Sequence, residues 1–417
     1  MEERFEIKES ERQSWLSLAF VWTGSMICIP CLMIGGIVGT GLSLWQVVLA
    51  VLVGYGIVCT YMCLVGMESC DTGLPTVSMA ASVLGRRGAQ FIISLMLAIA
   101  CIGWFGIQSA VCGESFSAMV ADFTGFEIPV WLSSVFWGII MLLTAVYGYN
   151  GLKILNYIAV PALVIVLVYS MVLAFSGGGF ATVASYVPAS RMSFISAVSM
   201  VVASFALGGV ISGDYSRYAR SRKDVVKSTL LGVFPSGLVM MLVGSILSIV
   251  TGQYDISLVL AAVGVPALGL VALVLATWTT NVTNAYSGGL AVSNLLGFGE
   301  DKFKISCSVA GLVGTVLAAV GLLSRFEFFL NILSALIPPI AGVMIASYWI
   351  VGKGRRENLV EKEGWYLPGI LAFAIGALVA YITGNIVVLF IGPVNGIVTA
   401  MLAFIILERV MAKGGKA

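Results

Sequence analysis

Long apolar runs alternate with short polar connections over nearly the whole chain. A helix needs roughly 17–25 apolar residues to cross a bilayer, and twelve runs reach that length. The connections leave no room for a separate soluble domain. We therefore predict an all-α membrane protein with spans near residues 16–40, 44–67, 90–120, 130–148, 155–175, 193–212, 228–250, 258–290, 305–323, 328–350, 366–384 and 386–407.

Composition supports this class. Hydrophobic residues make up 59% of the chain and charged residues 10%, against roughly 25% charged residues in soluble domains. The mean hydropathy is +1.05. A lipid bilayer is therefore the expected surrounding, and the net charge of +2 indicates no nucleic-acid partner.

Basic residues give the orientation, because Lys and Arg concentrate in cytoplasmic loops. With the N-terminus inside, all but two of the 22 basic residues fall on the cytoplasmic side, and only Arg191 and Arg325 remain outside. If one span had been missed, every later loop would lie on the opposite side of the membrane and the basic residues would no longer share one side. The distribution therefore also supports the count of twelve spans. The sequence thus predicts a multi-pass plasma-membrane protein with both termini in the cytoplasm.

A polar stretch interrupts the eighth run at residues 276–284. In a helix, Ala276, Thr279, Thr280 and Thr283 share one face. Unpaired polar groups are costly at bilayer depth, and that face offers a carbonyl and two hydroxyls to a small hard cation. The alternative is that the hydroxyls bond to carbonyls one turn earlier, as they often do in membrane helices.

Two spans carry helix-breaking residues near their centres. Pro30 lacks an N–H group, so carbonyls between Gly24 and Ile27 are expected to leave the helical ladder. In the sixth span, Gly208-Gly209 and Gly213 predict an unwound segment. Broken spans at matching positions of two halves are typical of transporters with inverted repeats and a central site. In the tenth span, Ile337-Pro338-Pro339 predicts a further bend or break.

The third span carries an aromatic ring and a carboxamide on one face, at Trp104 and Gln108. Gly103 and Gly106 leave space beside them. These side chains either contact a ligand or pack as core and bond a neighbouring helix. The chain has no His, and Glu114 is the carboxylate that we consider for proton binding. The eight cysteines lie within or beside spans, as small core residues do. We find no nucleophile–base or metal cluster, so we expect neither an enzyme nor a cofactor.

Several motifs resemble, in order and spacing, those of the nucleobase:cation symporter-1 family, and most closely its bacterial cytosine permeases. The motifs are Gly39-Thr40-Gly41-Leu42-Ser43, Gly103-Trp104-Phe105-Gly106, Ser204-Phe205, Gly213-Asp214-Tyr215-Ser216-Arg217-Tyr218, Trp278-Thr279-Thr280-Asn281 and Ile337-Pro338-Pro339.

The resemblance implies a leucine-transporter-like fold in which two inverted five-helix repeats, residues 16–175 and 193–350, form a core over residues 16–350. Residues 366–407 would add two peripheral helices, with cytoplasmic segments at 1–15 and 408–417. It further implies import of a nucleobase with a cation, and we expect that cation to be sodium. We also expect the chain to act as a monomer. The family's sodium ligands match the carbonyls of Gly24, Ile27 and Ala276 and the hydroxyls of Thr279 and Thr280. Its base-binding positions match Trp104 and Phe205 as the enclosing rings, with Ser204, Asn281 and Gln108 as polar neighbours.

Three positions depart from the cytosine permeases: Cys101 stands where they carry Gln, Ala276 where they carry Asn, and Leu207 where a second serine is found. Gln108 instead matches a position of the hydantoin-type relatives. Cytosine is therefore the first expectation for the substrate. The alternatives are a proton-coupled symporter of a purine, hydantoin or allantoin-like heterocycle and, from a different class, a channel or membrane-embedded binding protein.

Overall fold

The computed structural model describes residues 7–147, 152–253, 259–260, 262 and 266–414. Within these ranges the chain is helical, and the one extended pairing is an isolated bridge between Gln13 and Ala219. The main helices are α1 (Trp15–Met26), α2 (Ile29–Gly41), α3 (Leu44–Thr72), α4 (Thr76–Leu84), α5 (Arg86–Thr124), α6 (Val130–Tyr147), α7 (Leu152–Ser176), α8 (Gly179–Ala184), α9 (Phe194–Val210), α10 (Gly213–Ser216), α11 (Arg222–Thr251), α13 (Pro266–Leu296), α14 (Phe303–Ala319), α15 (Phe326–Leu336), α16 (Pro338–Ile345), α17 (Leu367–Tyr381) and α18 (Gly392–Gly414).

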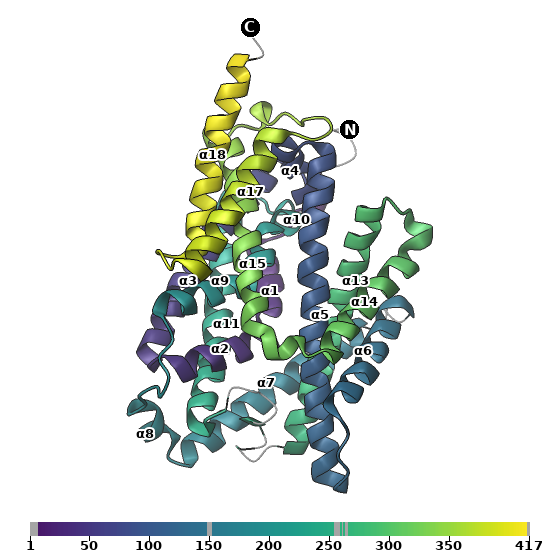
Figure 1. Cartoon of the computed structure of the whole chain (residues 1–417), viewed down its shortest axis with the longest axis vertical. Coiled ribbons are helices and arrows are strands. Elements are labelled where there is room, and N and C mark those ends of the chain that lie inside the picture. The colour runs from purple at the N-terminus through teal and green to yellow at the C-terminus, as the bar shows by residue number, and fades with distance from the viewer. Residues whose placement is uncertain (1–6, 148–151, 254–258, 261, 263–265, 415–417) are drawn as a thin grey trace.

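The helices pack in three groups (Figure 1). One group contains α1, α2, α3, α9 and α11, and a second contains α5, α6, α13 and α14. Helices α17 and α18 pack on each other and against α16. The predicted all-α class is therefore confirmed, while the division into core and peripheral helices stays a prediction.

Seven helices in the described ranges are long and apolar enough to cross a membrane, and the bent pair α1–α2 makes an eighth span if it is counted as one. Three shorter apolar helices lie at Pro161–Ser176, Phe194–Val210 and Phe303–Ala319. This is consistent with twelve spans, although the number itself stays a prediction. The second span is longer than the predicted 44–67, because α3 continues to Thr72 and so includes Glu68.

Small residues bring α2 and α11 together. A Cβ atom on Gly35 would lie 2.3 Å from the carbonyl oxygen of Met241, and one on Gly244 would lie 2.1 Å from that of Leu32. The Ser245 hydroxyl donates across this contact to the Gly35 carbonyl at 2.6 Å. Close approach through glycine and serine is how membrane helices gain packing energy without a hydrophobic driving force.

The basic segments predicted to share one side of the membrane do meet. The Arg12 guanidinium donates to the Ala219 carbonyl at 2.7 Å, and Arg86 pairs with Glu361 at 2.8 Å. Both ends of the chain lie at this end of the molecule (Figure 1). These contacts place the loops on one side, and the assignment of that side to the cytoplasm stays a prediction.

The tenth span is interrupted where its double proline predicts. Helix α15 ends at Leu336 and α16 begins at Pro338, which has no N–H to donate. Ile337 between them keeps helical angles, with φ −82° and ψ −50°. The span then ends in a π-helical segment, η6 (Ala346–Val351). The prolines therefore interrupt the hydrogen-bond ladder while the backbone stays helical.

Candidate functional site

The first span breaks at the predicted place. Helices α1 and α2 meet at 60°, and Ile27 between them has φ −79° and ψ 78°. The Cys28 N–H donates to the Met26 carbonyl at 3.0 Å, whereas a continuous helix would direct it to Gly24. Helix α2 starts with Pro30 in its first turn. The carbonyls of Gly24 and Ile27 are thus released from regular helical pairing at one point of the chain.

Three further oxygens converge on α13. The hydroxyls of Thr279 and Thr280 both donate to the Ala276 carbonyl, each at 3.0 Å. Thr279 is buried and Thr280 half-buried. The predicted common face therefore exists, and so does the predicted alternative in which the hydroxyls bond one turn back. Each hydroxyl oxygen retains lone pairs after donating its proton, so this bonding leaves both as acceptors toward a cation.

The five predicted sodium ligands thus form two clusters on different helices. Gly24 and Ile27 lie at the break of the first span, and Ala276, Thr279 and Thr280 lie on α13. Helix α2, which continues the broken span, contacts α13. The structure brings the members of each cluster together, and a single site composed of both stays a prediction.

Trp104 and Gln108 lie on α5, one helical turn apart. The indole of Trp104 is half-buried and makes edge-on contacts with Phe326 and Phe329 of α15, with ring centroids 5.8 and 5.3 Å away. Gln108 is 2% exposed, and its Oε1 atom has no hydrogen-bond partner among the residues that the structure describes. Cys101, two turns earlier, is buried close to Gly288 of α13. A buried acceptor without a donor costs about 1–3 kcal/mol, which favours a ligand that supplies one.

The sixth span is interrupted at two places, of which the sequence predicted one. Phe205 has non-helical angles inside α9, with φ −131° and ψ 18°, three residues before the Gly208-Gly209 pair. Gly208 permits this turn, because a Cβ atom there would lie 2.6 Å from the Phe205 ring. The helix ends at Val210 and resumes at Gly213. The span therefore bends at Phe205, which was not predicted, and ends its helix between Gly209 and Gly213, where the glycines predict an unwound segment.

Ser204 and Phe205 have partners on the first group of helices. The Ser204 hydroxyl donates to the Val201 carbonyl at 2.6 Å and lies 3.3 Å from the Tyr55 hydroxyl. The Phe205 ring makes an edge contact with Trp22 at 6.2 Å. Among the described residues, Phe205 and Trp104 make no ring contact with each other, and their role as enclosing rings stays a prediction. The sequence reasoning missed Tyr55, although a tyrosine in mid-span, away from the interfaces, was a signal.

Asn281 lies between helices. Its Nδ2 atom is 3.0 Å from the Phe105 carbonyl, 2.9 Å from the Ser109 hydroxyl and 3.2 Å from the sulfur of Met141. The side chain is fully buried, and its Oδ1 accepts from Asn284 at 3.3 Å. This carboxamide joins α13 to α5 and α6, so its predicted contact with a substrate would require these bonds to be exchanged.

A cavity of about 770 Å³ lies between α1, α7 and α11. It reaches the break in the first span at Thr23 and Ile27, and the rest of its lining is mostly aliphatic. Trp104 and Gln108 are not part of it. A planar polar ring needs hydrogen-bond partners at its edge, so this cavity does not fit a nucleobase.

The cysteines behave as predicted. All eight carry free thiols, and seven are buried. Cys28 and Cys31 lie with their sulfurs 3.4 Å apart at the start of α2. They are packing residues at the break rather than a disulfide framework.

Broken spans beside freed backbone carbonyls and clustered oxygens, inside an all-helical membrane protein, are typical of secondary transporters. The sequence profile of the family described as "Permease for cytosine/purines, uracil, thiamine, allantoin" matches residues 6–407. The chain belongs to this family, the nucleobase:cation symporters that the sequence motifs indicated. The prediction of a transporter rather than an enzyme is confirmed, because the curated relatives are permeases.

The chain is 32% identical over 410 residues to the cytosine permease of Escherichia coli, covering 97% of this chain and 93% of the relative. It is 24% identical to the hydantoin permease of Microbacterium maritypicum, covering 95% and 86%. Among solved structures, it superposes on Mhp1 in an inward-facing conformation with a TM-score of 0.83 at 23% identity, covering 97% and 92% of the two chains. This likeness supports the predicted fold.

Proposed function

We propose that the chain imports a nucleobase, with cytosine as the first candidate, together with sodium by alternating access. The name of the Escherichia coli relative, cytosine permease, supports the choice of base. We further infer that the chain lies in the plasma membrane with both termini in the cytoplasm, as the distribution of basic residues predicts. We also propose that it acts as a monomer.

The observation that carries the substrate proposal is the buried, unpaired Oε1 atom of Gln108. It lies one turn from Trp104, whose half-buried ring offers a flat face on the same side of α5. A planar base needs a π face for its ring and polar groups for its edge. The exocyclic amine of cytosine is a donor of the kind that Oε1 lacks. Ser204 and Phe205 would complete the site from α9.

The sodium proposal rests on the oxygens of α13 and of the broken first span. The hydroxyl oxygens of Thr279 and Thr280 each lie 3.0 Å from the Ala276 carbonyl oxygen. Sodium prefers such oxygen ligands, as hard cations do. An ion that also binds the carbonyls of Gly24 and Ile27 would hold α13 to the first span. Base and sodium would then tighten each other's binding by the same factor.

A second candidate is a proton-coupled symporter of a purine, hydantoin or allantoin-like heterocycle. Relatives named hydantoin permease and putative allantoin permease are each 24% identical to this chain. Cys101 and Leu207 replace polar residues of the cytosine permeases, which leaves fewer groups for the edge of a base. The substrate and the coupling ion are therefore tested together.

Thermal stabilisation of the purified chain distinguishes these functions. We would measure it with cytosine, uracil, adenine, guanine, hypoxanthine, hydantoin and allantoin, each in sodium and in choline. A shift with cytosine that needs sodium supports the proposal. Equal shifts in both salts argue for the proton-coupled candidate, and no shift with any compound argues against a nucleobase substrate.

Thr280→Ala tests the ion site separately. Removing one hydroxyl ligand should raise the sodium concentration needed for half-maximal uptake, while the order of preference among bases is kept. Thr283→Ala is the matched control, because Thr283 lies on the same helix and is exposed. Unchanged sodium dependence in Thr280→Ala would remove Thr280 from the ion site.

A further inference from the structure

One carboxylate lies inside the helix bundle without a hydrogen-bond partner. Glu68 is on α3, one turn before the end of that helix, and its side chain is 0% exposed. Neither Oε1 nor Oε2 accepts or donates a hydrogen bond in the described part of the chain. A buried carboxylate without donors or a counter-ion is strongly disfavoured, whereas the neutral acid is tolerated at much lower cost.

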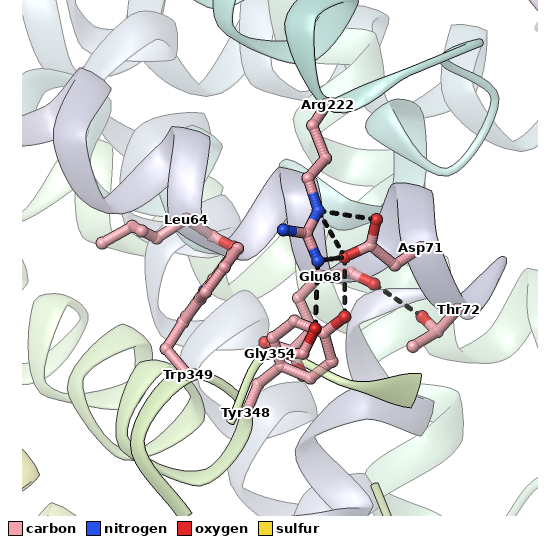
Figure 2. A network of polar contacts seen from close by, with 8 residues as sticks. All are labelled: Leu64, Glu68, Asp71, Thr72, Arg222, Tyr348, Trp349 and Gly354. Atoms are coloured by element: carbon pink, nitrogen blue, oxygen red, sulfur yellow. Dashed lines mark hydrogen bonds and ion pairs between the residues drawn. The ribbon is translucent and has the colours of Figure 1, made fainter. Parts of the chain in front are cut away.

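The neighbouring cation does not neutralise Glu68, because other groups engage it. The Arg222 Nε atom lies 2.9 Å from both carboxylate oxygens of Asp71, and its NH2 group forms an ion pair with Asp71 at 2.6 Å. The same NH2 group donates to the Gly354 carbonyl at 3.0 Å, and the guanidinium lies 4.9 Å from the centre of the Trp349 ring. Figure 2 shows Arg222 directed at Asp71.

Other titratable or charged groups stand on the elements that pack against this part of α3. None of them forms a hydrogen bond with the Glu68 carboxyl among the described residues. They include Cys70 and Asp71 on α3, Arg222 and Asp224 on α11, Tyr348 on η6, Asp214 and Tyr215 on α10, Arg217 directly after it, Arg12 near Cys70, and Arg356 and Glu357 on the short helix η7 (Arg356–Asn358).

Glu68 lies where the end of the tenth span joins α3. The Trp349 indole donates to the Leu64 carbonyl at 3.1 Å, one turn before Glu68. The Tyr348 hydroxyl donates to Asp71 at 2.6 Å, one turn after it. Leu64, Glu68 and Asp71 are spaced to share one face of the helix, and Figure 2 shows all three beside the segment that carries Tyr348 and Trp349. Glu68 therefore lies along α3 between the two hydrogen bonds that attach η6 to this helix.

We propose that Glu68 is a proton-binding site whose protonation stabilises the attachment of η6 to α3. When the contact forms, Glu68 takes up one proton from water and is buried as the neutral acid. When the contact opens, water reaches the carboxyl and the proton is released. Proton binding and attachment are then linked, so each favours the other by the same factor. The pH-dependent attachment then lies at the end of the tenth span, whose helical hydrogen bonds are already interrupted at Pro338.

The sign of the pH effect follows from the two states. Above the ordinary titration range of glutamate, unfolded Glu68 is ionised while folded Glu68 must keep its proton. The folded form therefore loses stability as pH rises, with the unfolding equilibrium changing up to about tenfold per pH unit for one proton. The glutamine in Glu68→Gln is neutral at every pH, so this variant lacks the part of the pH dependence of stability that comes from Glu68.

Thermal unfolding of the purified full-length chain, without base or sodium, tests the proposal from about pH 5 to about pH 8. Glu68→Gln should gain stability relative to the unmodified chain, by a margin that widens as pH rises. Glu363→Gln, whose side chain is 85% exposed, is the matched control and should show no such widening. Amide exchange of residues 346–351 at the alkaline end should be slower in Glu68→Gln than in the unmodified chain.

Parallel stability curves for the unmodified chain and Glu68→Gln would overturn the proposal, since Glu68 would then only fill space. If Glu68→Gln does not fold, infrared spectra of the unmodified chain decide the question. A protonated carboxyl band that persists well above the ordinary range of glutamate, and that moves in Glu68→Asp, supports the site. The absence of any such band overturns it. Thermal unfolding, amide exchange and infrared spectroscopy are all carried out without base or sodium, so their results are independent of the proposed function.

Discussion

Replacing Asn281 by alanine separates a structural role from a substrate-binding role. The side chain is fully buried, and its Nδ2 atom donates to the Phe105 carbonyl and the Ser109 hydroxyl at 3.0 and 2.9 Å. Hydrogen bonds between membrane helices contribute on average about 0.6 kcal/mol and at most about 1.7. The Phe105 carbonyl and the Ser109 hydroxyl would be left without this partner, and unpaired buried groups add about 1–3 kcal/mol to the loss of stability. We therefore expect Asn281→Ala to lower the free energy of unfolding by about 2–4 kcal/mol.

The assay is denaturant or thermal unfolding of the protein without substrate. Asn284→Ala is the control, because Asn284 is half-buried and, within the described ranges, its side chain forms one hydrogen bond, at 3.3 Å, to Asn281. Asn284→Ala should lower the free energy of unfolding by less than about 1 kcal/mol. The reasoning is refuted if Asn281→Ala keeps full stability in the absence of substrate and loses base-dependent stabilisation. That result would mean that the carboxamide serves the ligand, as the family resemblance implied.

Further substitutions test packing and the aromatic face. Gly209→Ala should destabilise the protein by about 1–3 kcal/mol, because the added Cβ would lie 2.3 Å from the ring of buried Tyr61; unchanged unfolding would show that the ring yields freely. Trp104→Ala should abolish stabilisation by the base while the substrate-free protein remains folded, and Trp104→Phe should restore part of it; a base shift that survives alanine would remove Trp104 from the site. Gln108→Leu should be at least as stable as the unmodified chain without substrate, because it removes an unpaired buried oxygen, and should lose base binding in the same thermal-shift assay.

The sequence predicts where along a helix a break or polar group lies far better than it predicts toward which neighbour a side chain points. The break in the first span follows from Pro30, and the oxygen face of α13 follows from the spacing of Ala276, Thr279 and Thr280. The turn at Phe205 could not be predicted, because it depends on a ring settling over Gly208. Glu68 was also missed, since the predicted second span ended at residue 67 and placed it in a loop.

The sequence by itself determined the class of protein, the run of apolar spans and the points where helices break. These properties are local: hydropathy is summed along the chain, and a proline lacks its N–H whatever surrounds it. The tertiary structure alone decided that Asn281 bonds α5, that Gln108 has an oxygen without a partner in the described part of the chain, and that Glu68 is buried between the two bonds that attach η6 to α3. In a soluble helix the apolar stripe shows which side faces inward. In a membrane, lipid and neighbouring helices are equally apolar, so that stripe is lost and only packing fixes where each polar side chain points.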